Sequence, residues 1–191
     1  MESKCSSTKE IKQIIKSLKT KKSYGYNKIS TKILELSNPF LCSPINYICN
    51  KMLFWGVFRD RLKYAIIKPL HENDDRWEVS KYRPVSLLIS FSKIFETLME
   101  RRILNHLNKC NILSTEQYGC RLGLGTDNAT YKLTSEVLNA TNNRLLVGGI
   151  FCDLEEAFDC VNHDILLSKL KFYGIGDKDV HLIPYIGIPF P

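Results

Sequence analysis

The sequence predicts an α+β fold in which helices outnumber a few short strands. Apolar residues recur with a helical period in several long segments, as in amphipathic helices. Short runs rich in β-branched and aromatic residues, which are typical of strands, lie between those segments and are not adjacent along the chain. This mixture favours α+β over a helical bundle or a β-sandwich.

The first quarter of the chain is predicted to be helical. A capping-box pattern, Ser7-x-x-Glu10, precedes Ile11, Ile14 and Ile15 at helical spacing, which indicates a helix start at Ser7. The elements expected here are a helix over about 7–20, a loop over 21–28, a short helix over 31–36 and, after Pro39, a helix to about 54.

Strands and helices alternate in the rest of the chain. The run 62–70 is rich in β-branched residues, and Pro84 in a second apolar run is tolerated at a sheet edge. Gly174 is placed to end the last helix. The expected elements are strands over 62–70, 82–89 and 145–151, helices over 91–107, 127–139 and 165–173, and a glycine-bearing loop up to 125.

Charge is unevenly distributed. The chain of 191 residues has a formal net charge of +7. Lysines dominate residues 1–37, whereas acids outnumber lysines from residue 150 onward. A basic entry and an acidic later segment suit a protein that binds phosphates in one place and metal ions in another. A solvated lysine-rich helix face explains the first segment equally well.

The cysteines and the hydropathy pattern indicate an intracellular protein, cytoplasmic or nuclear. Seven scattered cysteines, never spaced as CxxC, argue against a disulfide framework and a zinc module. No apolar run approaches the roughly 18 to 20 residues that span a bilayer, so we expect no membrane partner.

Four acids follow the apolar run 145–151: Asp153, Glu155, Glu156 and Asp159. An EF-hand loop starting at Asp153 would need an oxygen ligand and a glycine where Ala157 and Phe158 stand, so that reading fails. A glycosidase pair is possible in principle, but no other residue favours a sugar substrate.

The spacing of Asp153 and Phe158 suggests a metal-bound triphosphate. A carboxylate at the last position of a strand emerges at the rim of a sheet, and a helical turn would bring Phe158 over the same rim. Magnesium prefers one or two carboxylates together with phosphate oxygens and water. The alternative is a solvated acidic turn with Phe158 in the core.

The stretch Phe151–His163 reads Phe-Cys-Asp-Leu-Glu-Glu-Ala-Phe-Asp-Cys-Val-Asn-His. It resembles the first catalytic motif of reverse transcriptases from non-LTR retrotransposons, of the jockey-like and long interspersed element type. The pattern of that motif is F-x-D-x-x-x-A-F-D-x-V-x-H. Five further segments resemble that family in the same order: Tyr24–Leu34, Tyr82–Leu88, Ser92–Glu96, Gln117–Arg121 and Ile165–Ile175. The resemblance covers about residues 20–183.

This resemblance implies the fingers and a partial, incomplete palm of a right-hand polymerase. It divides the chain into a basic helix over 1–20, a fingers-like region over 21–147 and a partial palm over 148–191. The implied substrates are an RNA template, a DNA primer and dNTPs, and the implied cofactor is Mg²⁺ in a two-metal site. The activity implied is RNA-directed DNA synthesis.

The same resemblance assigns roles to individual residues. Asp153 matches the first catalytic, metal-binding aspartate, and Leu154 the position whose backbone carbonyl joins it. Phe158 matches the residue that excludes a ribose 2′-hydroxyl. Arg83 and Arg121 match basic residues that contact template backbone or triphosphate, where a guanidinium suits phosphate oxygens.

The sequence also departs from the family pattern. These residues contain no (F/Y)ADD motif, which carries the family's second set of acids, and Cys120 stands where the family has phenylalanine. We therefore expect a reverse transcriptase fragment, truncated after the first palm motif and inactive alone. The alternatives are a non-catalytic remnant that binds nucleic acid or protein, and an unfolded translation product.

Overall fold

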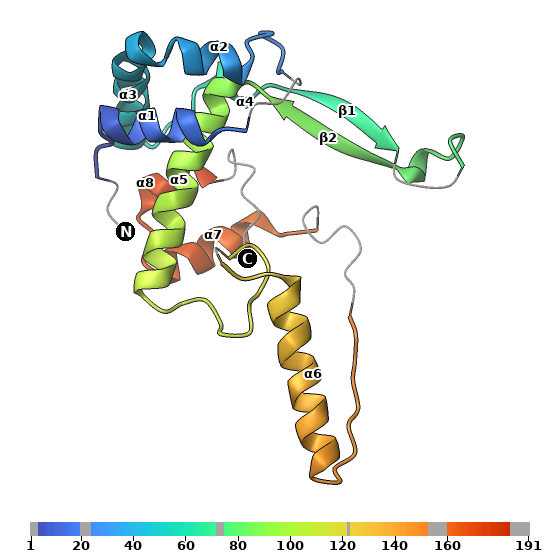
Figure 1. The fold of residues 1–191 in the computed structure, drawn as a ribbon. Helices are drawn as coiled ribbons and strands as arrows, with labels where there is room; N and C mark the ends of the chain where they lie inside the picture. The colour runs from blue at the N-terminus through green and yellow to red at the C-terminus, as the bar shows by residue number, and fades with distance from the viewer. Residues whose placement is uncertain (1–3, 20–23, 72–74, 122, 153–159, 184–191) are drawn as a thin grey trace.

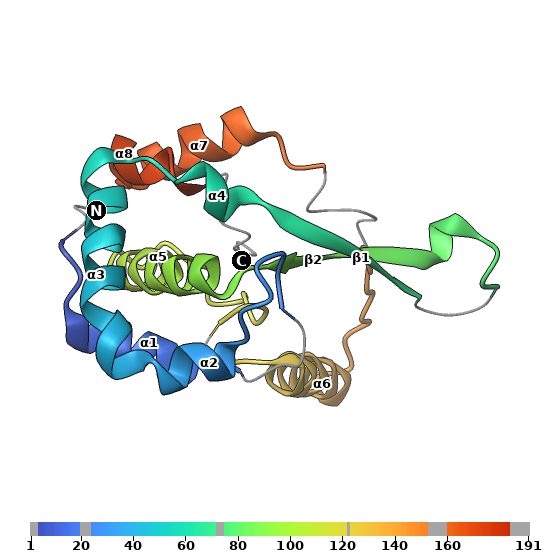
Figure 2. The ribbon, with the colours of Figure 1, turned by 90° about the horizontal axis from the view of Figure 1, so that it is seen from above.

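Helices of the N-terminal half and of the C-terminal end surround one long central helix, α5, from which a two-stranded hairpin projects (Figures 1 and 2). The computed structural model describes residues 4–19, 24–71, 75–121, 123–152 and 160–183. Its helices are α1 (Thr8–Ser17), α2 (Thr31–Leu36), α3 (Asn38–Trp55), α4 (Asp60–Lys63), α5 (Ser90–Lys109), α6 (Thr126–Asn142), α7 (His163–Phe172) and α8 (Asp177–Val180). The strands are β1 (Ala65–His71) and β2 (Tyr82–Leu88), and a 3-10 turn, η1 (Val79–Lys81), precedes β2.

The first hydrophobic core joins α1, α2 and α3 to the N-terminal half of α5. Ser7 caps α1 as predicted, because its hydroxyl accepts a hydrogen bond from the backbone N–H of Glu10 at 3.1 Å. The periodic isoleucines of α1 are fully or almost fully buried, and Phe95 of α5 meets Phe58 with ring centroids 5.5 Å apart. The core consists of Ile11, Ile14, Ile15, Leu34, Cys42, Ile45, Cys49, Met52, Leu53, Phe58, Ile94, Phe95, Leu98, Met99 and Leu182.

A second core forms on the C-terminal half of α5. Ile103 and Leu107 of α5 pack with Leu170 of α7 and Val180 of α8, together with Ile175 and Ile183. Gly174, with φ +81°, ends α7 in the left-handed region, as predicted from its position. Helix α5 therefore belongs to both cores and connects the two halves of the chain.

The predicted strands 62–70 and 82–89 form an antiparallel hairpin. The first begins later than expected, because residues 60–63 form the helical turn α4. Pro69 lies opposite Pro84 in the ladder. Proline has no backbone N–H, so the two prolines fit a pair position at which the N–H groups would point away from the partner strand. The outer edge of each strand therefore lacks one hydrogen-bond donor near its middle. That arrangement weakens pairing with another chain.

The predicted strand over 145–151 is wrong. Residues 145–152 have no regular secondary structure and are exposed, and Ile150 and Phe151 expose 93% and 89% of their surface. A strand needs a neighbour to pair its backbone groups, and no described segment pairs with this one. Apolar composition favoured burial in a sheet, but the pairing partner is a long-range feature that composition does not contain.

Helix α6 stands away from both cores, and the segment 145–152 runs back beside it (Figures 1 and 2). None of its residues is buried, and Tyr131, Leu133 and Leu138 are exposed. The remaining predicted helices are confirmed within a few residues, whereas α4 and α8 were not predicted. Both are single turns of four residues, too short to show a hydrophobic period.

Candidate functional site

The residues predicted for catalysis, metal binding and sugar selection, Asp153, Leu154 and Phe158, lie outside the described residues. The described residues on the two sides of these positions show which parts of the chain the motif Phe151–His163 connects. On one side is the exposed segment 145–152, and on the other is the capped start of α7. The Asn162 side chain accepts hydrogen bonds from the backbone N–H groups of Asp164 and Ile165 at 3.0 and 3.1 Å. The asparagine of this motif is therefore the N-cap of α7.

Arg83 lies on β2, opposite Leu70 of β1, and its side chain is exposed. Side chains of a strand alternate between faces, and paired residues share a face. Lys68, opposite Val85, therefore lies on the same face of the hairpin as Arg83. This places two cations on one side of a projecting ribbon.

Arg121 lies in the loop after α5, beside a groove of about 810 Å³. Its guanidinium donates a hydrogen bond to the backbone carbonyl of Ser114 at 2.8 Å, which ties the end of the loop to its beginning. The loop begins with a turn, in which the Gln117 N–H donates a hydrogen bond to the Ser114 carbonyl at 3.1 Å. The described residues lining the groove are Thr97, Glu100, Arg101, Leu104, Asn105, Asn108, Leu113, Arg121 and Leu124.

The structure does not bring the two predicted arginines into this groove together. The lining comes from α5 and the loop that follows it, whereas Arg83 lies on the hairpin that precedes α5. Besides Arg121, the described charged residues that line the groove are one cation, Arg101, and one acid, Glu100. Arg101 also donates a hydrogen bond to the Ser17 hydroxyl at 3.1 Å.

Glu96, in the segment Ser92–Glu96, is a titratable group in an unfavourable environment. Its Oε1 atom is buried and has no hydrogen-bond partner in the structure. The pKa of Glu96 is raised to about 7, chiefly by burial; Lys93 lowers it and Glu100 raises it, both by smaller amounts. A carboxyl group of this kind takes up a proton near neutral pH. No local sequence pattern predicts this raised pKa, because the burial of Glu96 depends on tertiary packing.

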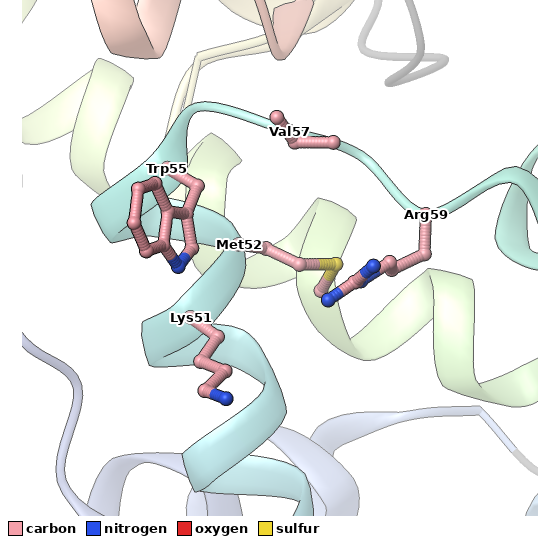
Figure 3. Close-up of a pocket in the computed structure, with 5 residues that line it drawn as sticks. All are labelled: Lys51, Met52, Trp55, Val57 and Arg59. Carbon is pink, nitrogen blue, oxygen red and sulfur yellow. The ribbon is translucent and has the colours of Figure 1, made fainter.

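A smaller pocket opens at the C-terminal end of α3 (Figure 3). Its volume is about 230 Å³, and Figure 3 shows the Arg59 guanidinium beside the Met52 side chain, with the Trp55 indole on the opposite side. The described residues lining it are Lys51, Met52, Trp55, Val57 and Arg59. The sequence analysis does not predict this pocket, and the local signal for it is that aromatic residues interleave with cations in the stretch 51–59.

The described residues contain no group of three or more His, Cys, Asp or Glu side chains arranged to hold a metal ion. The expected magnesium ligands Asp153 and Leu154 are not among them. In the part of the chain that the structure covers, no helix has the length and apolar character to cross a bilayer.

A protein-family model described as reverse transcriptase (RNA-dependent DNA polymerase) matches residues 70–186, which is more than half of the chain. The chain belongs to the reverse transcriptase family. The match includes the arginines of the hairpin and the loop, and the whole stretch Phe151–His163.

Curated relatives place this reverse transcriptase chain beside mobile-element enzymes. It is 33% identical over 173 residues to "Probable RNA-directed DNA polymerase from transposon BS" of Drosophila melanogaster, covering 87% of this chain and 19% of the relative. It is 32% identical over 163 residues to "RNA-directed DNA polymerase from mobile element jockey" of the same species, covering 85% and 18%. The predicted resemblance to non-LTR retrotransposon enzymes is confirmed. The chain spans about a fifth of the length of these relatives.

Two serines at the start of α5, Ser92 of the motif segment Ser92–Glu96 and its neighbour Ser90, have structural roles. The Ser90 hydroxyl donates to the Ile29 carbonyl at 2.9 Å, and the Ser92 hydroxyl donates to the Leu62 carbonyl at 2.7 Å. Both serines are buried at the start of α5. They attach this helix to the loop before α2 and to the end of α4. The segment Ser92–Glu96 therefore contributes to assembly of the fold.

Proposed function

We propose that this chain forms the fingers and part of the palm of a reverse transcriptase from a non-LTR retrotransposon, which copies RNA into DNA. One observation carries the proposal: the match to the reverse transcriptase family model over residues 70–186. It includes the motif Phe151–His163, in which an aspartate and a phenylalanine stand at the family's spacing.

In this proposal some residues of the motif Phe151–His163 bind magnesium and another selects the sugar of the nucleotide. The Asp153 carboxylate and the Leu154 backbone carbonyl bind Mg²⁺, for which oxygen donors are the preferred ligands. The Phe158 ring limits the space beside the sugar and selects deoxynucleotides. Magnesium held by these residues would activate the primer 3′-hydroxyl and would stabilise the departing pyrophosphate.

Arg83 and Arg121 contact the phosphates of the template or of the incoming nucleotide. The exposure of Arg83 on a hairpin that also carries Lys68 supports a backbone contact. Arg121 lines an open groove and is held in place by its bond to the Ser114 carbonyl. The two arginines lie on different elements, Arg83 on β2 and Arg121 in the loop after α5.

The 191-residue chain on its own does not extend primers. A two-metal site needs more than one carboxylate, and these residues contain no (F/Y)ADD motif. Incubation with an RNA template, a DNA primer, Mg²⁺ and dNTPs should leave the primer unextended. Incorporation that Asp153→Ala abolishes would contradict this expectation.

A chimera tests the function itself. Residues 20–183 replace the matching segment of the polymerase from mobile element jockey, and primer extension on an RNA template is measured. We expect extension that Asp153→Ala abolishes. A chimera that binds template and primer as tightly as the parent enzyme but extends nothing would overturn the proposal. Extension that survives Asp153→Ala would overturn the role of Asp153.

The second candidate, a non-catalytic nucleic-acid-binding module, is favoured by the exposed cations of the hairpin. Binding of the isolated chain to an RNA–DNA hybrid should fall with added salt, and removal of charge at Arg83 or Arg121 should weaken it. Lys109→Ala, at an exposed lysine at the end of α5, is the matched control. Retained hybrid binding together with a chimera that does not extend primers would favour this candidate.

A further inference from the structure

We propose that the pocket at the end of α3 binds single-stranded nucleic acid, with one base stacked on Trp55 and the flanking phosphates held by Lys51 and Arg59. The proposal rests on the proposed function, because it adds a site for a strand that a reverse transcriptase handles. None of the described residues that line the pocket belongs to the groove of Arg121 or to the described part of the stretch Phe151–His163.

The indole of Trp55 is exposed but held in a defined position. The residue exposes 65% of its surface, and its ring forms an edge-to-face pair with the Phe54 ring, with centroids 5.1 Å apart and planes at 89°. Phe54 in turn lies 5.0 Å from the Lys178 ammonium of α8. A fixed aromatic face in solvent is what base stacking uses, because little conformational entropy is then lost on binding.

The turn that follows Trp55 is also fixed. Gly56 caps α3 in the left-handed region, with φ +64°, and a Cβ built there would lie 3.0 Å from the Lys178 carbonyl oxygen. This close approach seats the turn against α8. The positions of Trp55 and Val57 on the two sides of the pocket are therefore set by the fold.

The charge at the pocket matches a phosphodiester chain. Lys51 and Arg59 are the charged residues among the described lining, and no acid is among them. The nearest acid along the chain, Asp60, forms an ion pair with Lys63 at 2.9 Å. Figure 3 shows the Lys51 ammonium and the Arg59 guanidinium on the two sides of Met52, below and to the right of the Trp55 ring.

The size of the pocket fits one flat ring. Its volume of about 230 Å³ is below the range of roughly 300–1,000 Å³ that encloses a whole small molecule. Met52, almost fully buried, and Val57 give the pocket an apolar lining. A single aromatic surface flanked by cations binds every base and reads no sequence. An aromatic side chain of a partner protein would fill the ring space but would not use both cations.

Fluorescence of Trp55 tests the proposal directly. The chain contains two tryptophans, so Trp77→Phe, a change at a residue that is almost fully exposed, leaves Trp55 as the sole indole. A 12-nucleotide single-stranded RNA, the same sequence as DNA, and an RNA duplex are the probes. We expect both single strands to quench the fluorescence at low salt and the duplex to quench it little.

Affinity measured by anisotropy of a labelled strand completes the test. Trp55→Ala should weaken binding by about 5- to 150-fold, the range for loss of one base–aromatic stack, whereas Trp55→Phe should retain most of it. Lys51→Ala and Arg59→Ala should each lower the salt dependence by about 0.7 in log–log slope. Trp77→Ala and Lys109→Ala are the matched controls, and thermal melting checks the folding of every variant.

Three results would overturn the inference. One is Trp55→Ala binding like Trp77→Ala. Another is that the salt dependence of strand binding is the same in Lys51→Ala and Arg59→Ala as in the parent chain. The third is quenching by an acidic, tyrosine-containing peptide but by neither single strand, which would indicate a protein partner. If the chimera extends primers but Trp55→Ala binds the labelled strand as tightly as the parent chain, the proposed role of the pocket is wrong and the proposed function stands. Stacking on Trp55 with an inactive chimera refutes the polymerase proposal alone.

Discussion

Gly25 shows how closely the loop before α2 approaches the start of α5. A Cβ built on Gly25 would lie 2.7 Å from the backbone nitrogen of Ile89 and 2.8 Å from its Cα and Cγ2 atoms. Backbone atoms cannot rotate away from such a contact, and Ile89 is buried. The segment Tyr24–Leu34 therefore needs a glycine at this position for packing.

Replacing Gly25 should destabilise the protein by about 1 to 3 kcal/mol, the cost of overpacking a filled site. The measurement is the urea midpoint of Gly25→Ala. Gly125→Ala is the matched control, because nothing lies within 4 Å of its added Cβ and its φ of −162° suits any residue. Equal midpoints for both variants would show that the loop does not pack on Ile89.

Glu96 makes stability depend on pH near neutrality. Its pKa rises from 4.5 in the unfolded chain to about 7 in the fold, chiefly because of burial. Because the pKa is higher in the fold than in the unfolded chain, protonation of Glu96 stabilises the fold. This contribution to the free energy of unfolding is fully present below pH 4.5 and is lost as the pH rises through 7. Ionisation at pH 8 then costs on the order of 3 kcal/mol, at 1.36 kcal/mol for each unit of pKa shift.

Glu96→Gln keeps the shape of the side chain and removes the titration. We expect the variant to be more stable than the parent at pH 8 and about equal to it at pH 5, measured as urea midpoints at both values. Glu35→Gln, at an exposed glutamate, controls for net charge. A gain of equal size at both pH values would show that Glu96 ionises as freely in the fold as in the unfolded chain.

At the scale of elements, the N-terminal segment is attached to α3 through a polar cluster. The Asn50 side chain accepts a hydrogen bond from the Ser6 N–H at 2.6 Å and donates one to the Ser6 carbonyl at 3.0 Å. The Ser6 hydroxyl donates to Asn46 at 2.8 Å. Ser6 is buried, so these bonds satisfy backbone groups that have lost water.

Asn50→Ala should therefore lower the free energy of unfolding by about 1 to 3 kcal/mol, since it leaves buried groups of Ser6 unpaired. The control is Asn105→Ala, at an exposed asparagine within α5. Urea unfolding followed by circular dichroism gives both values. If Asn50→Ala lowers the free energy of unfolding no more than Asn105→Ala does, the segment before α1 is not held against α3.

Helices with their own capping and period could be predicted from sequence. The Ser7 cap and the isoleucines of α1 are local signals, and the structure has them as expected. The segment 145–151 could not be predicted in this way, because pairing of a strand depends on residues far away in the chain. The pocket at Trp55 depends on a contact between Gly56 and Lys178, over a hundred positions apart, and no local pattern predicts such a contact.

At the scale of the molecule, packing is concentrated around α5. Its N-terminal half belongs to the core with α1, α2 and α3, and its C-terminal half belongs to the core with α7 and α8. Helix α6 and the segment 145–152 take part in neither core and expose tyrosine, leucine and phenylalanine side chains. Exposed apolar surface of this kind is typical of interaction sites and of segments that are prone to aggregation.

Hydrogen exchange should reveal this division. An isolated helix of 17 residues is only marginally stable in water, so amides of 126–152 should exchange almost as fast as in an unfolded chain. Amides of α3 and α5 should exchange far more slowly, because opening them disrupts a core. Mass spectrometry of peptides from a dilution series measures both. Strong protection of α6 at every concentration would contradict its lack of packing, whereas protection that appears only at high concentration would show that copies of the chain cover one another's exposed helix.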